Sequence, residues 1–269
     1  MSTQDTMQTP TEELTVHEWK PPHAPAGIVL ISHGYAEHAG RYERLAQWLT
    51  DAGIMVVAPD YRGHGRSPGE RGLLQDLDAC ANDLAVVRAT AAERHGKLPT
   101  ALIGHSMGGN IAIRFMQLGY GDDLRALVLS GPVAGGNPDV FALANHDPIV
   151  NVPLDPAVLS RDHNVGKAFN ADPLVYHGPY LRETLIAYKI SVDRIAAGPQ
   201  LPTVPTLWVH GELDSLAPLD LTRDALERIR GRRFDGIVYP EARHEIFNET
   251  NATDVLGDVV SFVARCVKK

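Results

Sequence analysis

Cysteine is scarce in this sequence: only Cys80 and Cys266 occur among its 269 residues. Two cysteines are too few for a disulfide framework, and neither belongs to a Cys-x-x-Cys pair of the kind that binds zinc. We therefore expect both side chains to serve in packing, in a reducing compartment. The sequence implies neither a metal nor an organic cofactor.

Long apolar runs and a surplus of positive charge are also lacking. No run reaches the roughly 18 apolar residues that a membrane-spanning helix needs, and residues 1–12 lack the charged-then-apolar layout of a secretory signal. The net charge is −8, and no Lys/Arg cluster offsets it, which argues against a nucleic-acid partner. We expect a cytoplasmic protein, either monomer or homodimer, whose contact with membranes is transient and peripheral.

What the sequence does contain is a series of short aliphatic runs separated by helix-like segments. The runs lie at residues 27–32, 54–58, 100–104, 126–130, 206–209 and 236–239, with a weaker one at 14–19. Continuous apolar runs of this kind are typical of parallel strands buried on both faces. Segments such as 42–51 and 255–263 place their apolar residues on one helical stripe. The pattern predicts an α/β fold with a mostly parallel central sheet flanked by helices.

The alternation of strands and helices stops between residues 131 and 200. Proline, asparagine, aspartate and histidine become frequent there, and only residues 181–197 look clearly helical. We therefore predict a first part of the core at residues 1–130, an inserted lid or cap at 131–200, and a second part of the core at 201–269. The lid should consist of loops and short helices over the carboxyl edge of the sheet.

The most specific motif is Gly-His-Ser-Met-Gly-Gly at residues 104–109. It follows the predicted strand and opens a helical segment, and so sharp a turn needs small neighbours around Ser106, which explains Gly104 and Gly108. If Ser106 merely capped a helix, both glycines and the buried strand would be coincidences. We predict that Ser106 is a nucleophile at a helix amino terminus, where negative charge is stabilised.

A serine hydroxyl needs an imidazole base, and the imidazole needs a carboxylate to fix its tautomer. Asp214 and His244 each follow a predicted strand, and the order Ser, Asp, His along the chain is that of α/β-hydrolases. Glu212 competes with Asp214 for the acid role; we prefer Asp214 and interpret Glu212 as a turn residue. His105 and His210 flank the site, and local backbone contacts would satisfy them.

An oxyanion hole requires two N–H donors, one from the residue after the nucleophile and one from the loop after an early strand. Met107 supplies the first. The second comes from Tyr35, which follows the predicted strand at 27–32 in the sequence His33-Gly34-Tyr35. The alternative is that this turn is only structural.

Taken together, the motifs resemble the monoacylglycerol lipase and lysophospholipase family of α/β-hydrolases over nearly the whole chain. They are HGYAEH at 33–38, RY at 41–42, DYRGHGRS at 60–67, GHSMGG at 104–109, LSRD at 159–162 and NADPL at 170–174. The resemblance implies cleavage of a monoacylglycerol to fatty acid and glycerol through an acyl-enzyme, with a lid that forms the acyl channel. By position it implies that Glu37 and Arg41 line a polar glycerol pocket. The alternative is an ion pair that holds their loop against the following helix.

The sequence departs from the family at two positions: Ala36 stands where the family usually has glycine, and Phe169 where many members have tyrosine. The missing hydroxyl bears on glycerol contacts more than on ester chemistry. The same triad would also serve a carboxylesterase, thioesterase or lysophospholipase, and the same fold could serve a non-catalytic receptor for a small ligand. Peptide hydrolysis would need carboxylates for an amino terminus, and the lid has no identifiable cluster of them.

Overall fold

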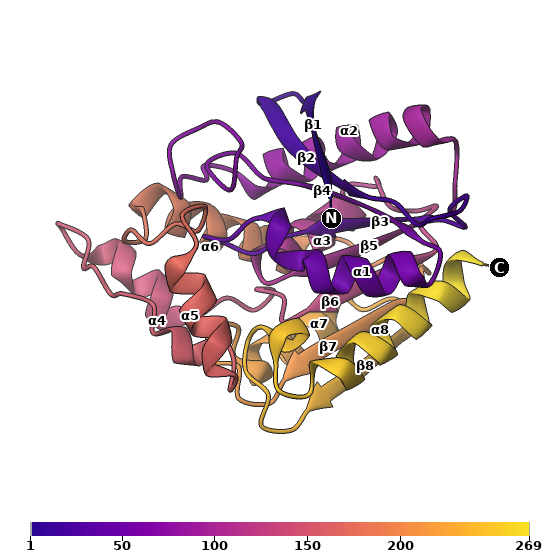
Figure 1. Ribbon diagram of the computed structural model, residues 1–269. Coiled ribbons are helices and arrows are strands. Elements are labelled where there is room, and N and C mark those ends of the chain that lie inside the picture. Colours follow the sequence, from indigo (N-terminus) through magenta and orange to yellow (C-terminus); the bar gives the residue numbers. More distant parts are fainter. Residues whose placement is uncertain (1, 269) are drawn as a thin grey trace.

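The computed structural model describes residues 2–268 and has an eight-stranded sheet at its centre (Figure 1). The strands are β1 (Thr3–Gln8), β2 (Glu13–Trp19), β3 (Ile28–Ser32), β4 (Met55–Pro59), β5 (Thr100–His105), β6 (Ala126–Ser130), β7 (Thr206–Gly211) and β8 (Phe234–Tyr239). Their spatial order is β1-β2-β4-β3-β5-β6-β7-β8. The first two pairs are antiparallel and the other five are parallel. The predicted fold class is confirmed.

Helices cover both faces of the sheet. They are α1 (Glu43–Asp51) and α8 (Ala252–Val267) on one face, and α2 (Leu77–His95), α3 (Met107–Gln117) and α7 (Leu219–Ile229) on the other. Successive strand residues face opposite layers: Leu30 packs with the α2 and α3 side, whereas Val29 and Ile31 pack with the α1 and α8 side. Burial on both faces explains why the strands read as continuous apolar runs rather than as alternating ones.

The amino-terminal strand β1 is the part of the sheet that the sequence did not predict. All of its residues except Met7 are polar and exposed, because it pairs only with β2 at the edge of the sheet. Such a strand has little apolar surface to bury, so it leaves no periodic signal in the sequence. Its polar composition is typical of an edge that must not pair with another chain.

Between β6 and β7 the chain leaves the sheet for about seventy residues, a stretch (131–200) that we call the β6–β7 insert. It contains α4 (Pro138–Ala142), α5 (His163–Ala171) and α6 (Arg182–Ala197), with short 3₁₀ turns at Leu143–Asn145 and Pro156–Val158. Its helices lie together at the left of Figure 1, beside the carboxyl ends of the parallel strands. Within residues 2–268, no helix has the length and apolar character required to cross a membrane.

Candidate active site

Ser106 lies in the tight turn between β5 and α3. Its φ of 53° and ψ of −115° form a conformation that side-chain-bearing residues rarely adopt, at a cost of about 1–3 kcal/mol. Small neighbours make the turn possible: a Cβ on Gly108 would lie 1.9 Å from the carbonyl oxygen of Ser32, and one on Gly104 would lie 2.3 Å from that of Gly108. The glycines of the motif are therefore required by close backbone approach, and Ser106 is held at the amino terminus of α3.

Asp214 and His244 follow the neighbouring parallel strands β7 and β8, which bring their loops together at the same sheet edge. Nδ1 of His244 lies 2.7 Å from Oδ2 of Asp214. The other carboxylate oxygen accepts hydrogen bonds from the N–H groups of Leu216 and Ala217, both at 2.9 Å. With Nδ1 donating to the carboxylate, the neutral imidazole carries its lone pair on Nε2, which is the form that a general base needs.

The two partners shift each other's pKa. Burial alone would lower the pKa of His244, but the charge and hydrogen bond of Asp214 raise it above its ordinary value. Burial acts in the opposite sense on Asp214, and His244 and His210 outweigh it and lower the pKa of that carboxyl group. Asp214 is thus an anion at neutral pH, and His244 is a stronger base than a free imidazole.

Two further histidines lie beside this pair. The ring of His105 is 4.7 Å from that of His244, and its Nδ1 lies 3.1 Å from the carbonyl oxygen of Ser130. Burial lowers the pKa of His105 to about 4, so it is neutral at pH 7. His210 donates from Nε2 to the carbonyl oxygen of Ala217 at 2.9 Å. Local backbone contacts therefore satisfy both rings, as the sequence analysis expected.

Glu212, the other candidate for the acid role, lies away from His244. Its side chain accepts a hydrogen bond at 2.9 Å from the backbone N–H of Glu241, and the residue is exposed. This hydrogen bond joins the turn after β7 to the turn after β8. The geometry therefore favours Asp214 as the partner of the imidazole.

The two predicted oxyanion donors lie at the end of β3 and at the start of α3. Tyr35 lines the same cavity as Ser106, whereas the side chain of Met107 is buried in the core, so only its backbone can serve. In the part of the chain that the structure describes, neither N–H group has a protein acceptor. The loop around Tyr35 is held by Glu37, whose Oε1 accepts from the N–H of Gly34 at 2.6 Å.

Arg41 stands between two carboxylates. Its Nη1 lies 2.8 Å from Oε2 of Glu37, and its guanidinium forms a bidentate pair with Glu245 at 2.7 and 2.9 Å. The guanidinium carbon also lies 5.1 Å from the ring centroid of Phe169. The ion pair between Glu37 and Arg41, expected if the two residues only hold their loop in place, is thus present. Both residues also line the cavity. Their role toward a substrate stays a prediction.

Glu245 also lines the cavity, although the sequence did not predict it as a site residue. One signal for it exists, because Glu245 directly follows His244 and must therefore lie at the same end of the sheet. Its pairing with Arg41, which is 204 positions away, could not be read from spacing. Together with Glu37 it makes one side of the cavity strongly polar.

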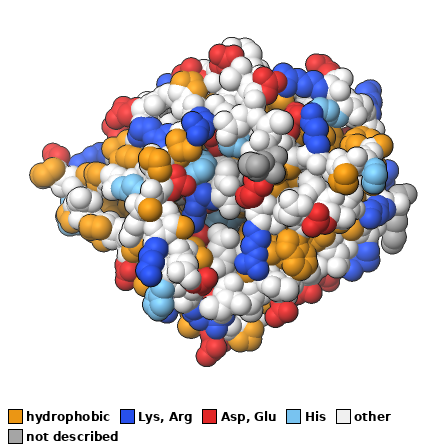
Figure 2. Space-filling view, in the orientation of Figure 1, with side chains coloured by type: hydrophobic (Ala, Val, Ile, Leu, Met, Phe, Trp, Pro, Cys, Tyr) orange, Lys and Arg blue, Asp and Glu red, His pale blue; other side chains and the backbone are white. Residues whose placement is uncertain are grey.

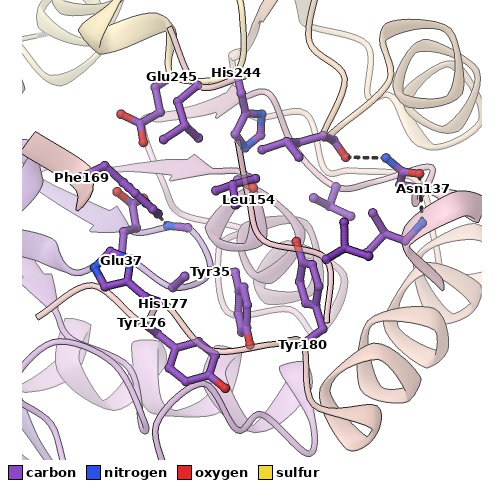
Figure 3. A pocket seen from close by; sticks show the side chains of 18 of the residues that line it. Tyr35, Glu37, Asn137, Leu154, Phe169, Tyr176, His177, Tyr180, His244 and Glu245 are labelled. Carbon is purple, nitrogen blue, oxygen red and sulfur yellow. Dashed lines mark hydrogen bonds between the residues drawn. The ribbon is translucent and has the colours of Figure 1, made fainter. Parts of the chain in front are cut away.

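Ser106 and His244 line a cavity of about 260 Å³ with two contrasting sides. Figure 3 shows Glu37, Phe169 and Glu245 on one side and Asn137 and Tyr180 on the other. Asn137 directly precedes α4 and Tyr180 lies just before α6, and these two helices contribute the apolar and aromatic side chains of Val140, Phe141, Leu185 and Tyr188 to the cavity lining. Among residues 2–268, no group of three or more His, Cys, Asp or Glu side chains could hold a metal ion.

Comparison with known proteins finds a hydrolase family model and several similar lipases. A family model described as serine aminopeptidase, S33, matches residues 23–251. The chain is 39% identical to a monoacylglycerol lipase of Mycolicibacterium smegmatis, over 91% of this chain and 90% of that protein. It is 33% identical to a monoglyceride lipase of Homo sapiens, over 74% of this chain and 68% of that protein.

Solved structures agree with this likeness. A crystal structure of the Paleococcus ferrophilus monoacylglycerol lipase superposes with a TM-score of 0.80 at 27% identity, covering 94% of this chain and 99% of that one. A soluble variant of the Saccharomyces cerevisiae monoglyceride lipase shares the fold at a TM-score of 0.85 and 20% identity, covering 100% and 96%. The resemblance predicted from the motifs is confirmed. The chain belongs to the α/β-hydrolase family described as serine aminopeptidase, S33, within which it is similar to the monoacylglycerol lipases.

Proposed function

We propose that this protein hydrolyses the ester bond of monoacylglycerols through an acyl-enzyme. Nε2 of His244 takes the proton of Ser106 as Oγ attacks the ester carbonyl carbon, and the N–H groups of Tyr35 and Met107 stabilise the oxyanion. His244 then returns the proton to the departing glycerol oxygen. A water molecule, deprotonated by His244, attacks the acyl carbon, and the fatty acid leaves as Ser106 regains its proton. Asp214 orients the imidazole and stabilises its protonated form throughout.

The observation that carries the proposal is the two-sided cavity around Ser106 and His244. A monoacylglycerol has one apolar chain and one small polar group, and its ester lies at the junction between them. The apolar and aromatic side chains of α4 and α6 suit the chain, and the side formed by Glu37, Arg41 and Glu245 suits hydroxyl groups, which both donate and accept hydrogen bonds.

The charges on the polar side favour a neutral head group. Two carboxylates, Glu37 and Glu245, surround the single guanidinium of Arg41, so this side carries one more negative than positive charge. A phosphate group would meet net repulsion there, which disfavours a lysophospholipid. The ammonium group of a peptide would have to compete with Arg41 for both carboxylates, which disfavours aminopeptidase activity. Glycerol carries no charge and escapes both penalties.

A substrate panel tests this assignment. We expect kcat/KM for a monoacylglycerol to exceed that for the diacylglycerol or lysophospholipid with the same acyl chain by at least about tenfold, equivalent to about 1.4 kcal/mol. An aminoacyl anilide should not be cleaved. Faster hydrolysis of short water-soluble esters would assign the site to a carboxylesterase instead. Failure of a fluorophosphonate to label Ser106 would favour a ligand-binding receptor.

We further propose that the β6–β7 insert is a lid that forms the acyl side of the cavity and contacts membrane surfaces. Four aliphatic side chains of the insert, Val150, Val152, Ile186 and Ile190, are each between 44% and 52% exposed. Arg182, at the start of α6, donates to the carbonyl oxygen of His146 at 2.5 Å and so holds the preceding loop beside that helix. Figure 2 shows hydrophobic side chains at the left end of the molecule, where Figure 1 places the helices of the insert. Exposed apolar side chains that belong to one segment of the chain favour a lipid interface there.

Vesicle co-sedimentation tests the membrane contact. Changing both Ile186 and Ile190 to glutamate should lower the partition coefficient onto phosphatidylcholine vesicles by at least about 100-fold, because each buried aliphatic side chain contributes about 1.5–3 kcal/mol and about 1.4 kcal/mol is a factor of ten. Leu118→Glu is the matched control: this exposed leucine follows α3, outside the insert, and its substitution should leave binding unchanged. Equal binding of all three proteins would contradict the proposal.

A further inference from the structure

The loop that carries His244 is joined to the β6–β7 insert by consecutive backbone hydrogen bonds. The N–H of Glu245 donates to the carbonyl oxygen of Leu159 at 2.7 Å, and the N–H of His244 donates to that of Val158 at 3.4 Å. The insert residues belong to the segment that runs into Leu-Ser-Arg-Asp at 159–162. The position of the imidazole therefore depends on a part of the chain that lies outside the sheet.

A buried carboxylate reinforces this junction. The side chain of Glu249 has no exposed surface. Its Oε1 accepts from the backbone N–H of Arg243 at 2.9 Å and from that of Arg161 at 3.1 Å. Its Oε2 accepts from Nε of Arg161 at 3.0 Å and from the N–H of Thr250 at 2.8 Å. One carboxylate thus binds both Arg243, the residue before His244, and Arg161 of the insert.

Glu249 acts here as an anion. Burial would raise its pKa, but the N–H groups of Thr250, Arg243 and Arg161 outweigh this and keep the pKa below its ordinary value. The guanidinium of Arg161 also reaches Oδ1 of Asn251 at 3.2 Å. Hydrogen bonds to a charged group are stronger than those between neutral groups, and leaving such a buried acceptor without its donors is costly. The junction is therefore a rigid one.

We infer that Arg161 and Glu249 are positioning residues, which fix the loop of His244 against the insert and so place the imidazole between Asp214 and Ser106. The inference rests on the proposed function of that imidazole as a base. Neither Arg161 nor Glu249 lines the cavity, so they do not touch the substrate. Because a misplacement of about 1 Å in a catalytic group can cost about 100-fold in rate, loosening the junction should affect turnover rather than binding.

Arg161→Ala and Glu249→Gln test the inference. We expect kcat for a monoacylglycerol to fall about 10- to 100-fold in each variant, with KM within about twofold of wild type. The rate of Ser106 labelling by a fluorophosphonate should fall by a similar factor. The control is Arg194→Ala, which removes another arginine of the same insert, whose ion pairs are made with Asp76 and Asp78 at the start of α2 rather than with the loop of His244. It should leave both rates near those of wild type.

Further measurements separate positioning from simple stabilisation. Thermal unfolding gives the temperature range in which every variant is folded, and all rates are compared there. If Arg161→Ala does not fold, Arg161→Lys replaces it, since it keeps the charge but loses the planar donor that contacts Glu249. The double variant should be no slower than the more impaired single variant, because both residues act through one junction.

Two outcomes would overturn the inference: wild-type rates in folded variants that unfold at lower temperature, or a rise in KM without a fall in kcat and labelling. The labelling experiment does not require the natural substrate. A wild-type protein that is labelled at Ser106 yet does not cleave monoacylglycerols would refute the proposed substrate, and the comparison of labelling rates would still decide the role of Arg161 and Glu249.

Discussion

Replacing Ser106 by alanine is expected to reduce monoacylglycerol hydrolysis by about a millionfold, which is the effect of removing the nucleophile in other serine hydrolases. The substitution deletes the only atom that can form the acyl-enzyme. The fold should survive, because alanine is smaller than serine and the close backbone approach at Gly104 and Gly108 is unchanged. Steady-state turnover and circular dichroism measure the two effects.

The matched control for this variant is Ser215→Ala, which alters an exposed serine next to Asp214 in the sequence. It should retain wild-type turnover and remain open to fluorophosphonate labelling, whereas Ser106→Ala should not be labelled. Turnover by Ser106→Ala at a rate near wild type would refute the assignment of the nucleophile.

Asp214→Asn is expected to lower kcat by about 10⁴-fold, because an amide favours the wrong tautomer of His244. It should also move the pH profile. The base must be neutral to accept a proton, so activity falls as pH drops through the pKa of His244. Burial lowers that pKa, while Asp214, Glu245 and Glu37 raise it above its ordinary value, which is about 6.5. The wild-type midpoint should therefore lie above about 6.5, and removing the charge of Asp214 should shift it downward.

Glu212→Gln is the control for this prediction, since Glu212 is the competing carboxylate in the same loop. Its turnover should stay within about twofold of wild type and its pH midpoint should not move, because its side chain binds the N–H of Glu241 instead of His244. A larger loss in Glu212→Gln than in Asp214→Asn would reverse the assignment.

The sequence was most informative where backbone geometry leaves little choice. Strands such as β3 and β5 are buried on both faces, so their apolar runs identified them. The turn at Ser106 has so little space that glycine is required at 104 and 108, which made the motif specific. Asp214 and His244 each follow a predicted parallel strand, so the sequence already placed them at the same edge of the sheet.

Contacts that depend on how the insert folds could not be predicted in the same way. Glu249 is recognisable as an anchor only once Arg161 is known to lie beside it. Two of the tyrosines that line the cavity, Tyr176 and Tyr180, come from the irregular stretch between α5 and α6, whose sequence has no periodic signal. Strand β1 was missed for a different reason, because its polar residues bury almost nothing.

One departure from the family has a structural meaning. Ala36 has a φ of 66°, in the left-handed region that favours glycine, which fits the glycine that the family resemblance implies at this position. A side chain in this conformation costs about 1–2 kcal/mol. Neighbouring residues hold the loop of Tyr35 in this shape. One of them is Tyr176, whose N–H donates to the carbonyl oxygen of Ala36 at 2.7 Å.

That last hydrogen bond limits how a substrate can enter. Helix α5 is tied on one side to the loop of Tyr35, through Tyr176 and through the contact of Asp172 with His38 at 2.9 Å. On its other side it is tied to the loop of His244 through Leu159. An outward movement of α5 would break these hydrogen bonds and so displace both the loop of Tyr35 and the loop of His244. Residues 148–154, by contrast, form no hydrogen bond with any other part of the described chain, and three of them border the cavity. Displacing this stretch would give the acyl chain access to the cavity and leave the hydrogen bonds to the loops of Tyr35 and His244 in place.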